Sequence, residues 1–416
     1  MRRLVLVGLV NLSLLLGGCG DDDNLTPVPV AVTPTRTPTP SVTATSTPTQ
    51  PPLTSAAVLQ PGPFGVGVTT MLFEDTSRPT MANGTFPGAP TRKLVTEIWY
   101  PTDPDVSATP PARRDAALAQ NGRPYPLVIY SHGFMSVRTG GAYLARHLAS
   151  YGYIVAAPDF PLTNSMAPGG PTVFDLVNQP GDVSFLIDRL LVLSADAESV
   201  FAGAIDAERI GLTGLSLGGS TTFLATFHPT LRDRRVRAAA PTAGGACFFG
   251  PRFYDDTTIP LMIVHGDIDA IVPYQQNAVF AFGEANPPKY LVTLQGAAHT
   301  AFADGAETLF ESLNNADDVG CLALSGGLGG DGSQGPSFLD QLGGADAGII
   351  MGDCPAPCQG PRRGPRAMRP SRQHTLTIAS IFPFFEATLR DDARARQYIE
   401  QTLGAENPDL TVQLAR

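Results

Sequence analysis

The stretch that most constrains the fold of this chain is Gly214-Leu-Ser-Leu-Gly218, in which one serine lies between two glycines. Residues 210–213 before it form an apolar run typical of a buried strand, and residues 220–228 after it are typical of a helix. A sharp turn from strand to helix holds such a serine with φ above zero, at a cost of roughly 1–3 kcal/mol. We therefore predict that Ser216 projects from the carboxyl edge of a sheet as a nucleophile. The alternative is a solvated serine in a glycine-rich turn.

Strand and helix patterns alternate along most of the chain. Continuous apolar runs such as residues 126–132 are typical of strands covered on both faces. Strands that alternate with helices predict an α/β fold, with a mostly parallel eight-stranded sheet and helices on both faces. The predicted strands are residues 65–73, 94–100, 126–132, 153–157, 210–213, 236–240, 261–264 and 290–294.

The N-terminal segment has the pattern of a targeting sequence. Two arginines precede an apolar stretch that is too short to span a bilayer comfortably. The stretch ends in Leu-Gly-Gly-Cys19, which resembles the lipobox of bacterial lipoproteins. This resemblance implies a signal peptide over residues 1–18, lipid on Cys19, and an exported, membrane-anchored protein in the periplasm or at the cell surface. The alternative is ordinary secretory cleavage beside an incidental cysteine.

Composition divides the rest of the chain into a stalk and a folded domain. Residues 19–60 are rich in Thr and Pro, have few bulky side chains, and predict a disordered, semi-rigid stalk. Residues 61–416 carry the strand and helix patterns and predict one domain. Within it, residues 325–371 are rich in Gly, Pro and Arg, and we expect an irregular excursion there, or alternatively a lid.

Charge and ligand patterns exclude several classes of function. The formal net charge is −10, so no basic surplus is present to bind nucleic acid. His265 lies close to two aspartates in sequence, which is one possible metal-binding pattern. Because no fourth ligand and no H-E-x-x-H motif accompany it, we predict no metal and no cofactor.

An acid and a base follow Ser216 in the chain order Ser, Asp, His that this type of site requires. Asp269 comes just after the predicted strand 261–264, and His299 comes just after 290–294. Carboxyl ends of parallel strands meet at one edge of a sheet, so we predict a triad of Ser216, Asp269 and His299. The alternatives are a helix cap for Asp269 and an ordinary loop histidine for His299.

An acyl-transfer site also needs N–H groups to bind the oxyanion. The Leu217 N–H directly follows the nucleophile, and the Phe134 N–H lies in the loop after the third predicted strand. We predict that these two groups form the oxyanion hole. His132, in the same loop, is expected to order the loop rather than to take part in proton transfer.

Several segments resemble a known family. Residues 97–101, 125–134, 147–153 and 209–219 are similar to the α/β-hydrolase family, and more narrowly to bacterial relatives of platelet-activating-factor acetylhydrolase and predicted dienelactone hydrolases. The resemblance implies a carboxylic ester hydrolase that needs no metal. It also favours Asp269 over Asp267 as the catalytic carboxylate. Dienelactone hydrolases proper have a cysteine where this chain has Ser216.

The same layout resembles bacterial cutinase-like polyester hydrolases, which place an aromatic clamp in the loop after the sixth strand. In this chain that loop, residues 241–247, has no aromatic residue before Phe248. Leu215 replaces an aromatic residue beside the serine, and Trp99 is expected in the core. We therefore predict small-molecule or lipid-like esters with short acyl groups as substrates. The alternatives are a polyester hydrolase, a peptidase or thioesterase, and a non-catalytic binding lipoprotein; no oligomeric state is predicted.

Four cysteines follow the serine turn, and an exported domain favours disulfides. Three pairings are possible for four cysteines. We expect Cys247 to pair with Cys321, because both are predicted to follow strands at the same sheet edge, and Cys354 to pair with Cys358.

Overall fold

The structure is a computed structural model that describes residues 51–104, 112–327, 338–350, 352, 354–359 and 364–416. The predicted signal peptide over residues 1–18, the lipid site Cys19 and the stalk up to residue 50 lie outside the described residues, so these stay predictions. Within the described ranges, no helix is both long enough and apolar enough to cross a membrane.

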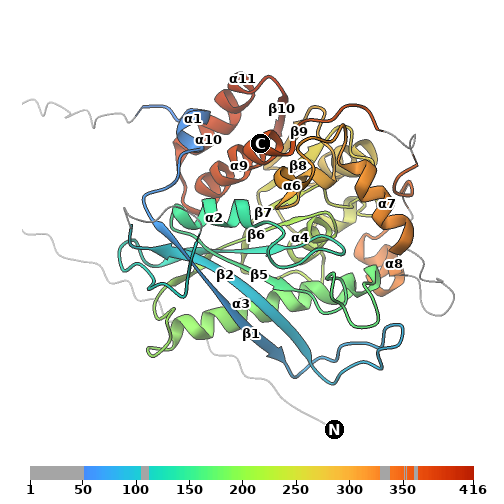
Figure 1. Cartoon of the computed structure of the whole chain (residues 1–416), viewed down its shortest axis with the longest axis horizontal. Coiled ribbons are helices and arrows are strands. Elements are labelled where there is room, and N and C mark those ends of the chain that lie inside the picture. The colour runs from blue at the N-terminus through green and yellow to red at the C-terminus, as the bar shows by residue number, and fades with distance from the viewer. Residues whose placement is uncertain (1–50, 105–111, 328–337, 351, 353, 360–363) are drawn as a thin grey trace, which may run out of the picture. The chain divides into compact units, whose positions relative to one another are not determined.

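One ten-stranded sheet organises the fold, in the order β10-β9-β8-β7-β6-β4-β5-β2-β1-β3 (Figure 1). The six strands from β9 to β5 pair in parallel. β2 pairs antiparallel with β5 and with β1, β10 pairs antiparallel with β9, and the edge strand β3 pairs in parallel with β1. The strands are β1 Gly65–Asp75, β2 Arg92–Thr102, β3 Arg113–Arg114, β4 Tyr125–Ser131, β5 Ile154–Asp159, β6 Ile205–Leu215, β7 Val236–Thr242, β8 Leu261–Gly266, β9 Lys289–Leu294 and β10 Leu410–Ala415.

The mostly parallel sheet is confirmed, but the predicted number of eight strands is too low. The two additional strands are β3 and β10, which form the edges of the sheet. β3 is only two residues long, and it lies in a segment with the composition of a polar loop. β10 pairs on one side only and stays largely exposed, so it lacks the apolar run that marks the buried strands.

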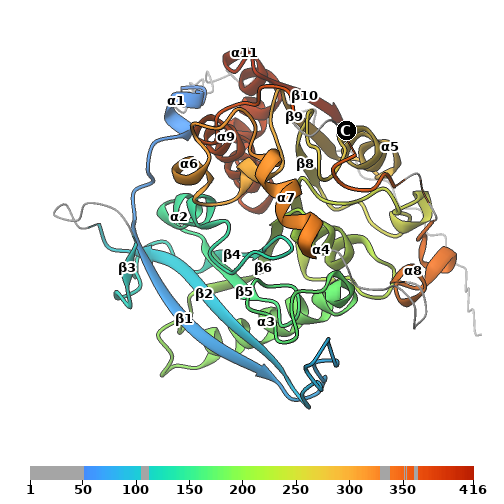
Figure 2. The same cartoon turned by 45° about the vertical axis from the view of Figure 1, so that its right-hand side comes forward.

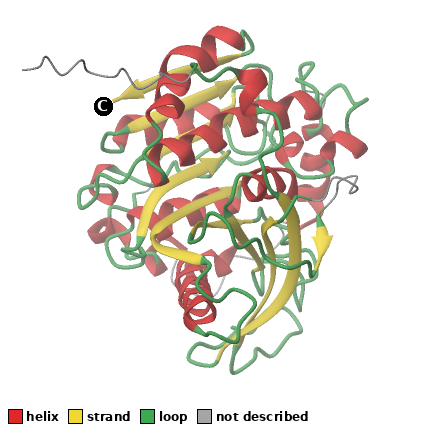
Figure 3. Ribbon diagram, turned by 90° about the vertical axis from the view of Figure 1, so that its left-hand side faces the viewer, coloured by secondary structure: helices red, strands yellow, loops and turns green. Residues whose placement is uncertain are grey.

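Helices cover both faces of the sheet, as predicted (Figure 3). In β4, Leu127 and Ile129 pack against α3, whereas Val128 and Tyr130 pack on the opposite face, in the core that contains α2 and α9. The α-helices are α1 Ser55–Val58, α2 Ala142–Ser150, α3 Gln179–Ala195, α4 Leu217–Phe227, α5 Phe280–Glu284, α6 Ala306–Leu309, α7 Asp317–Gly327, α8 Phe338–Gln341, α9 Pro370–Leu389, α10 Ala393–Gln397 and α11 Leu403–Glu406. Shorter or wider helical turns are η1 Val173–Asn178, η2 Pro251–Phe253, η3 Gln275–Val279, η4 Thr300–Phe302, η5 Gly344–Ala347 and η6 Tyr398–Thr402.

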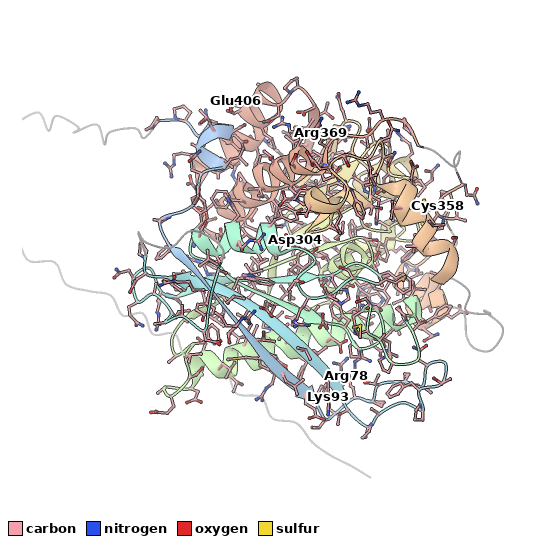
Figure 4. The ribbon with its side chains drawn as sticks, in the orientation of Figure 1. Arg78, Lys93, Asp304, Cys358, Arg369 and Glu406 are labelled. Atoms are coloured by element: carbon pink, nitrogen blue, oxygen red, sulfur yellow. A yellow bond between two sulfur atoms is a disulfide. The ribbon has the colours of Figure 1, made fainter. Side chains whose placement is uncertain are left out.

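The folded unit includes part of the segment that was predicted as stalk. Ser55, the first residue of α1, donates its N–H to the Glu406 carboxylate over 2.6 Å, and its hydroxyl lies 2.9 Å from the Tyr398 hydroxyl. Asn407 also donates to the Ser55 hydroxyl, over 2.8 Å. Glu406 is labelled next to α1 in Figure 4. The predicted domain start at residue 61 is therefore too late. Hydrogen bonds hold this segment against the domain, and its composition alone does not reveal them.

Both predicted disulfide pairings are wrong. Cys247 is bonded to Cys354 and Cys321 to Cys358, each with an S–S distance of 2.06 Å. The prediction assumed that Cys321 follows a strand, but this residue lies in helix α7. The two disulfides therefore attach the segment 325–371 to the loop after β7 and to helix α7.

A buried ion cluster joins the start of β2 to α3. Arg92 is fully buried and donates to both oxygens of Asp175, over 2.8 and 3.0 Å, and to both oxygens of Asp182, over 2.6 and 2.7 Å. Arg78 donates to Asp182 from the other side, over 2.8 Å. Every charge in the cluster is paired with good geometry, which is the condition under which buried ions are tolerated.

We expect Arg92→Met to lower the free energy of unfolding by about 3–5 kcal/mol, because it leaves two buried carboxylates short of their main partner. Urea unfolding followed by circular dichroism measures this change. The control is Lys93→Met at the next position (Figure 4), where the side chain is 61% exposed and lies 3.9 Å from Glu74. The control should change stability by less than about 1 kcal/mol, and equal losses in the two variants would contradict the role given to the cluster.

Candidate active site

Ser216 lies in a strained turn between β6 and α4. Its φ is +58° and its ψ is −118°, and its N–H donates to the Thr242 carbonyl over 2.9 Å. A Cβ atom on Gly218 would lie 1.9 Å from the Ser131 carbonyl oxygen, and one on Gly214 would lie 2.4 Å from the Gly218 carbonyl oxygen. Both glycines are therefore required for the chain to turn so tightly, and the turn presents Ser216 at the carboxyl end of β6.

Asp269 and His299, which lie thirty residues apart in sequence, are in direct contact. The distance between His299 Nδ1 and Asp269 Oδ2 is 2.7 Å, and both side chains are nearly inaccessible to solvent. Asp269 Oδ1 accepts the N–H groups of Ile271 and Val272 over 2.9 and 2.7 Å. β8 and β9 pair in parallel up to Gly266, so the loops that follow them leave the sheet side by side.

A second histidine contacts the same carboxylate. His265 Nε2 lies 2.8 Å from the Val272 carbonyl oxygen and 3.2 Å from Asp269 Oδ2. The sequence pattern around His265 indicated only a possible metal ligand and no role beside Asp269. Among the described residues, no set of three or more His, Cys, Asp and Glu side chains is arranged to hold a metal ion.

Charge pairing perturbs both members of the Asp269–His299 pair. Burial opposes ionisation of Asp269, but the two histidines outweigh it and hold the pKa of this carboxyl well below its usual range. Burial lowers the pKa of His299, but Asp269 outweighs it, with a smaller contribution from Asp317, so that the pKa is raised above its ordinary value of 6.5. The pair is thus arranged as a carboxylate that stabilises a positive charge on an adjacent imidazole.

The rejected alternative, Asp267, is placed differently. Its side chain is exposed, and its Oδ1 accepts the Gly296 N–H over 2.6 Å. The contact with His299 is made by Asp269, as expected from the sequence. The catalytic role of Asp269 itself stays a prediction.

The predicted oxyanion loop lies next to Ser216. A Cβ atom on Gly133 would be 3.3 Å from Ser216 Cβ and 3.9 Å from its Oγ, so the Gly133–Phe134 segment passes directly beside Ser216. Leu217 is the first residue of α4, where backbone N–H groups have no partner within the helix. This placement is compatible with an oxyanion hole formed by the Phe134 and Leu217 N–H groups, which stays a prediction.

His132 orders this loop through main-chain contacts. It is fully buried, its Nε2 accepts the Phe160 N–H over 3.1 Å, and its Nδ1 lies 2.8 Å from the Gly133 carbonyl oxygen. Burial lowers the pKa of His132, so the ring is held neutral. These contacts agree with the expectation that His132 orders the loop.

One contact of the predicted triad is absent. Among the described residues, Ser216 Oγ makes no hydrogen bond to His299, although both residues follow carboxyl ends of strands in the parallel part of the sheet. Contacts between a nucleophile and its base are often long without substrate and shorten when substrate binds. The structure therefore brings Asp269 and His299 together, and it places Ser216 on the same edge of the sheet.

Asp317 is a further carboxylate that the sequence analysis did not identify. It is buried at the start of α7, and its oxygens accept the backbone N–H groups of His299, Thr300 and Ala270. No motif in the sequence marks it, since its neighbours Asn315-Ala-Asp-Asp318 have the composition of an ordinary helix start. Only the fold shows that it contacts the two loops that carry Asp269 and His299.

Sequence comparisons with known proteins find several similar ones. Residues 119–313 match a family model described as PET hydrolase-like. Over 180 residues, the chain is 27% identical to cutinase est1 of Thermobifida alba, an alignment that covers 42% of this chain and 54% of that protein. It is 24% identical over 193 residues to a putative carboxymethylenebutenolidase of Yersinia pestis, covering 44% of this chain and 72% of that protein. The chain thus spans about half the length of the cutinase that it matches.

A solved structure supports the fold. The ferulic acid esterase from Streptomyces cinnamoneus superposes with a TM-score of 0.57 at 22% identity, covering 86% of this chain and 98% of that one. At this identity the similarity establishes the architecture alone. Together, the sheet order, the strained serine turn after β6 and this structural similarity show that the chain has an α/β-hydrolase fold.

Proposed function

We propose that this protein is a serine hydrolase of carboxylic esters. The observation that carries the proposal is the 2.7 Å contact between His299 and the buried Asp269, on the same sheet edge as the strained Ser216. A nucleophile, a base and a carboxylate that orients the base are the three groups that acyl transfer through an enzyme-bound ester requires. The cutinase relatives and the PET hydrolase-like match support this reaction class.

In the proposed mechanism, His299 takes the Ser216 proton as the hydroxyl attacks the ester carbonyl carbon. The N–H groups of Leu217 and Phe134 bind the oxyanion of the tetrahedral intermediate. His299 then donates its proton to the leaving alcohol, and an acyl-serine remains. Asp269 stabilises the imidazolium in both steps, which accounts for its position on Nδ1 of the base.

Water completes the cycle. His299 takes a proton from a water molecule that attacks the acyl-serine, the oxyanion forms again at the same N–H groups, and the acid leaves as Ser216 is re-protonated. The proton of the first half-reaction comes from Ser216 and that of the second from water, and His299 transfers each of them.

For the substrate, we propose soluble or lipid-like esters with short acyl groups, as in platelet-activating-factor acetylhydrolase-like enzymes. The loop after β7 supports this choice. Gly244 packs against Gly219 of α4, Ser220 Oγ donates to the Gly245 carbonyl over 2.8 Å, and Asn277 accepts the N–H groups of Ala246 and Cys247. The loop is thus held by close backbone contacts and carries no aromatic side chain on which a flat ring could stack.

A polyester hydrolase is the second candidate, and the PET hydrolase-like match over residues 119–313 favours it. Phe248, the first aromatic residue after the loop, packs against the buried Phe249 with ring centroids 4.4 Å apart. An aromatic clamp would have to come from this position or from another loop. The two candidates share the same chemistry and differ only in the substrate that the site accepts.

A hydrolysis profile distinguishes the two candidates. We expect kcat/KM to be highest on p-nitrophenyl acetate and butyrate and to fall towards palmitate, because a loop without an aromatic clamp offers little surface to a long or flat substrate. Little aromatic acid should be released from polyester film, and Ser216→Ala serves as the blank in every assay. Film hydrolysis at a rate comparable with small-ester turnover would favour the polyester hydrolase instead. Absence of turnover on every ester would overturn the proposed function.

A further inference from the structure

The carboxylate of Asp317 contacts both loops that carry the acid and the base. Its Oδ2 accepts the His299 N–H and the Ala270 N–H, each over 3.0 Å, and its Oδ1 accepts the Thr300 N–H over 2.7 Å. One buried carboxylate therefore fixes the backbone of the base itself and the residue next to Asp269. Its own N–H is held by Asn315 Oδ1 over 2.9 Å.

Helix α7, which begins at Asp317, packs against the same two loops. A Cβ atom on Gly320 would lie 2.1 Å from Thr300 Oγ1 and 2.9 Å from Ile271 Cδ1. A side chain at position 320 would not fit at these distances, so the backbone of α7 lies directly against both loops. Figure 2 shows α7, in orange, at the front of the domain in this view.

A second contact holds Ala270 through its carbonyl group. The Cys358 N–H donates to the Ala270 carbonyl over 2.7 Å, and Cys358 is disulfide-bonded to Cys321, one helical turn after Asp317. Figure 4 labels Cys358 beside α7. Ala270, which directly follows Asp269, thus has its N–H and its carbonyl held by two residues that are covalently linked through Cys321.

We propose that Asp317 is a positioning residue for catalysis, which holds the Asp269 loop and the His299 loop in register so that the two side chains meet. Because it concerns the catalytic pair, the inference rests on the proposed function. Asp317 lies beyond residue 313, where the PET hydrolase-like match ends, so the family match does not include this contact. Helix α7 spans Asp317–Gly327, so it contacts these two loops at its start and ends just inside the segment 325–371, which was expected to be irregular or alternatively a lid.

The negative charge of Asp317 provides a readout that packing alone would not change. The groups that face His299 are Asp269, with His265 behind it, and Asp317. Both carboxylates raise the pKa of His299, Asp269 more than Asp317. His299 acts as a base only when neutral, so activity rises with pH through its pKa, and removal of either charge moves this acidic limb to lower pH.

The test compares Asp317→Asn with Asp318→Asn. In Asp317→Asn the side chain cannot accept all three N–H groups, because an NH2 group replaces one of the acceptor oxygens. We expect kcat/KM on p-nitrophenyl butyrate to fall by about 10–100-fold, mainly in kcat, as is usual for small misplacement of catalytic groups. We also expect the acidic limb of the pH profile to move to lower pH. Asp318→Asn removes the same charge one residue away, where the carboxylate accepts the Gly364 N–H, and should leave rate and profile close to wild type.

Asp317→Glu separates geometry from charge. It keeps the negative charge but lengthens the side chain, so kcat should fall while the acidic limb stays close to that of the wild type. Amide hydrogen exchange at Ala270, His299 and Thr300 supplies a readout that needs no substrate. Exchange there should be faster in Asp317→Asn by about 10-fold or more and unchanged in Asp318→Asn.

These measurements separate failure of the inference from failure of the proposed function. If the wild-type protein hydrolyses no ester, the proposed function fails, and exchange at the three amides still decides whether Asp317 holds the loops. An active wild type together with an Asp317→Asn variant of equal rate, equal pH profile and equal exchange would overturn the inference alone. Equal losses in the Asp317 and Asp318 variants, or global unfolding of both Asp317 variants, would assign the residue to stability and also overturn it.

Discussion

Ser216→Ala is expected to lower kcat on p-nitrophenyl butyrate by roughly 10⁴–10⁶-fold, because the members of a triad act as a unit and loss of one removes most of their joint contribution. The residual rate comes from the oxyanion donors and from substrate binding. The fold should be retained, because alanine replaces only a half-exposed hydroxyl and keeps the same Cβ in the strained turn. Steady-state kinetics and thermal unfolding measure the two effects separately.

A matched control for this substitution lies in α4, the helix that directly follows Ser216. Ser220→Ala removes a hydroxyl that donates to the Gly245 carbonyl, four residues after Ser216. The cost of one such hydrogen bond is roughly 1 kcal/mol, so activity should fall by less than about tenfold. Ester turnover by Ser216→Ala near the wild-type rate would show that another group is the nucleophile.

The sequence was sufficient to predict the central part of the fold. Strands such as β4 and β8 are covered by helices on both faces, so nearly every residue in them is apolar and the runs are easily recognised. The edges were harder to predict, because β10 needs only one partner strand and leaves most of its side chains in solvent. Helix α1 was not predicted, because buried hydrogen bonds of Ser55, and not an apolar sequence pattern, hold it in place.

The contact between acid and base was predictable because it follows from chain order and from the geometry of parallel strands. Asp269 and His299 each leave the carboxyl end of a neighbouring strand, and this places them together without knowledge of any other contact. Contacts that depend on the path of an irregular segment follow no such rule. Both disulfides and the Asp317 contacts belong to that class, because only the three-dimensional path of α7 and the residues after it decides which groups meet.

The second large effect is expected for Asp269→Asn, with a loss in kcat of roughly 10⁴-fold. The amide oxygen can still accept the N–H groups of Ile271 and Val272, which places the NH2 group against His299. That contact requires Nδ1 of His299 to accept a hydrogen bond, so Nε2 carries the proton and cannot act as a base. Loss of the negative charge also lowers the pKa of His299, so the acidic limb of the residual activity should move to lower pH.

Asp267→Asn is the matched control for this change, because it removes the same charge two residues earlier in the same loop. Its side chain is exposed, and the oxygen that accepts the Gly296 N–H is retained in asparagine. We expect kcat to change by less than about tenfold, in line with the small effects of most surface substitutions. The acidic limb of the pH profile should stay in place, because Asp267 is not among the groups that perturb the pKa of His299. A larger loss of kcat in Asp267→Asn than in Asp269→Asn would reverse the assignment of the catalytic carboxylate, and equal losses would indicate that both variants disturb the loop rather than the tautomer of the base.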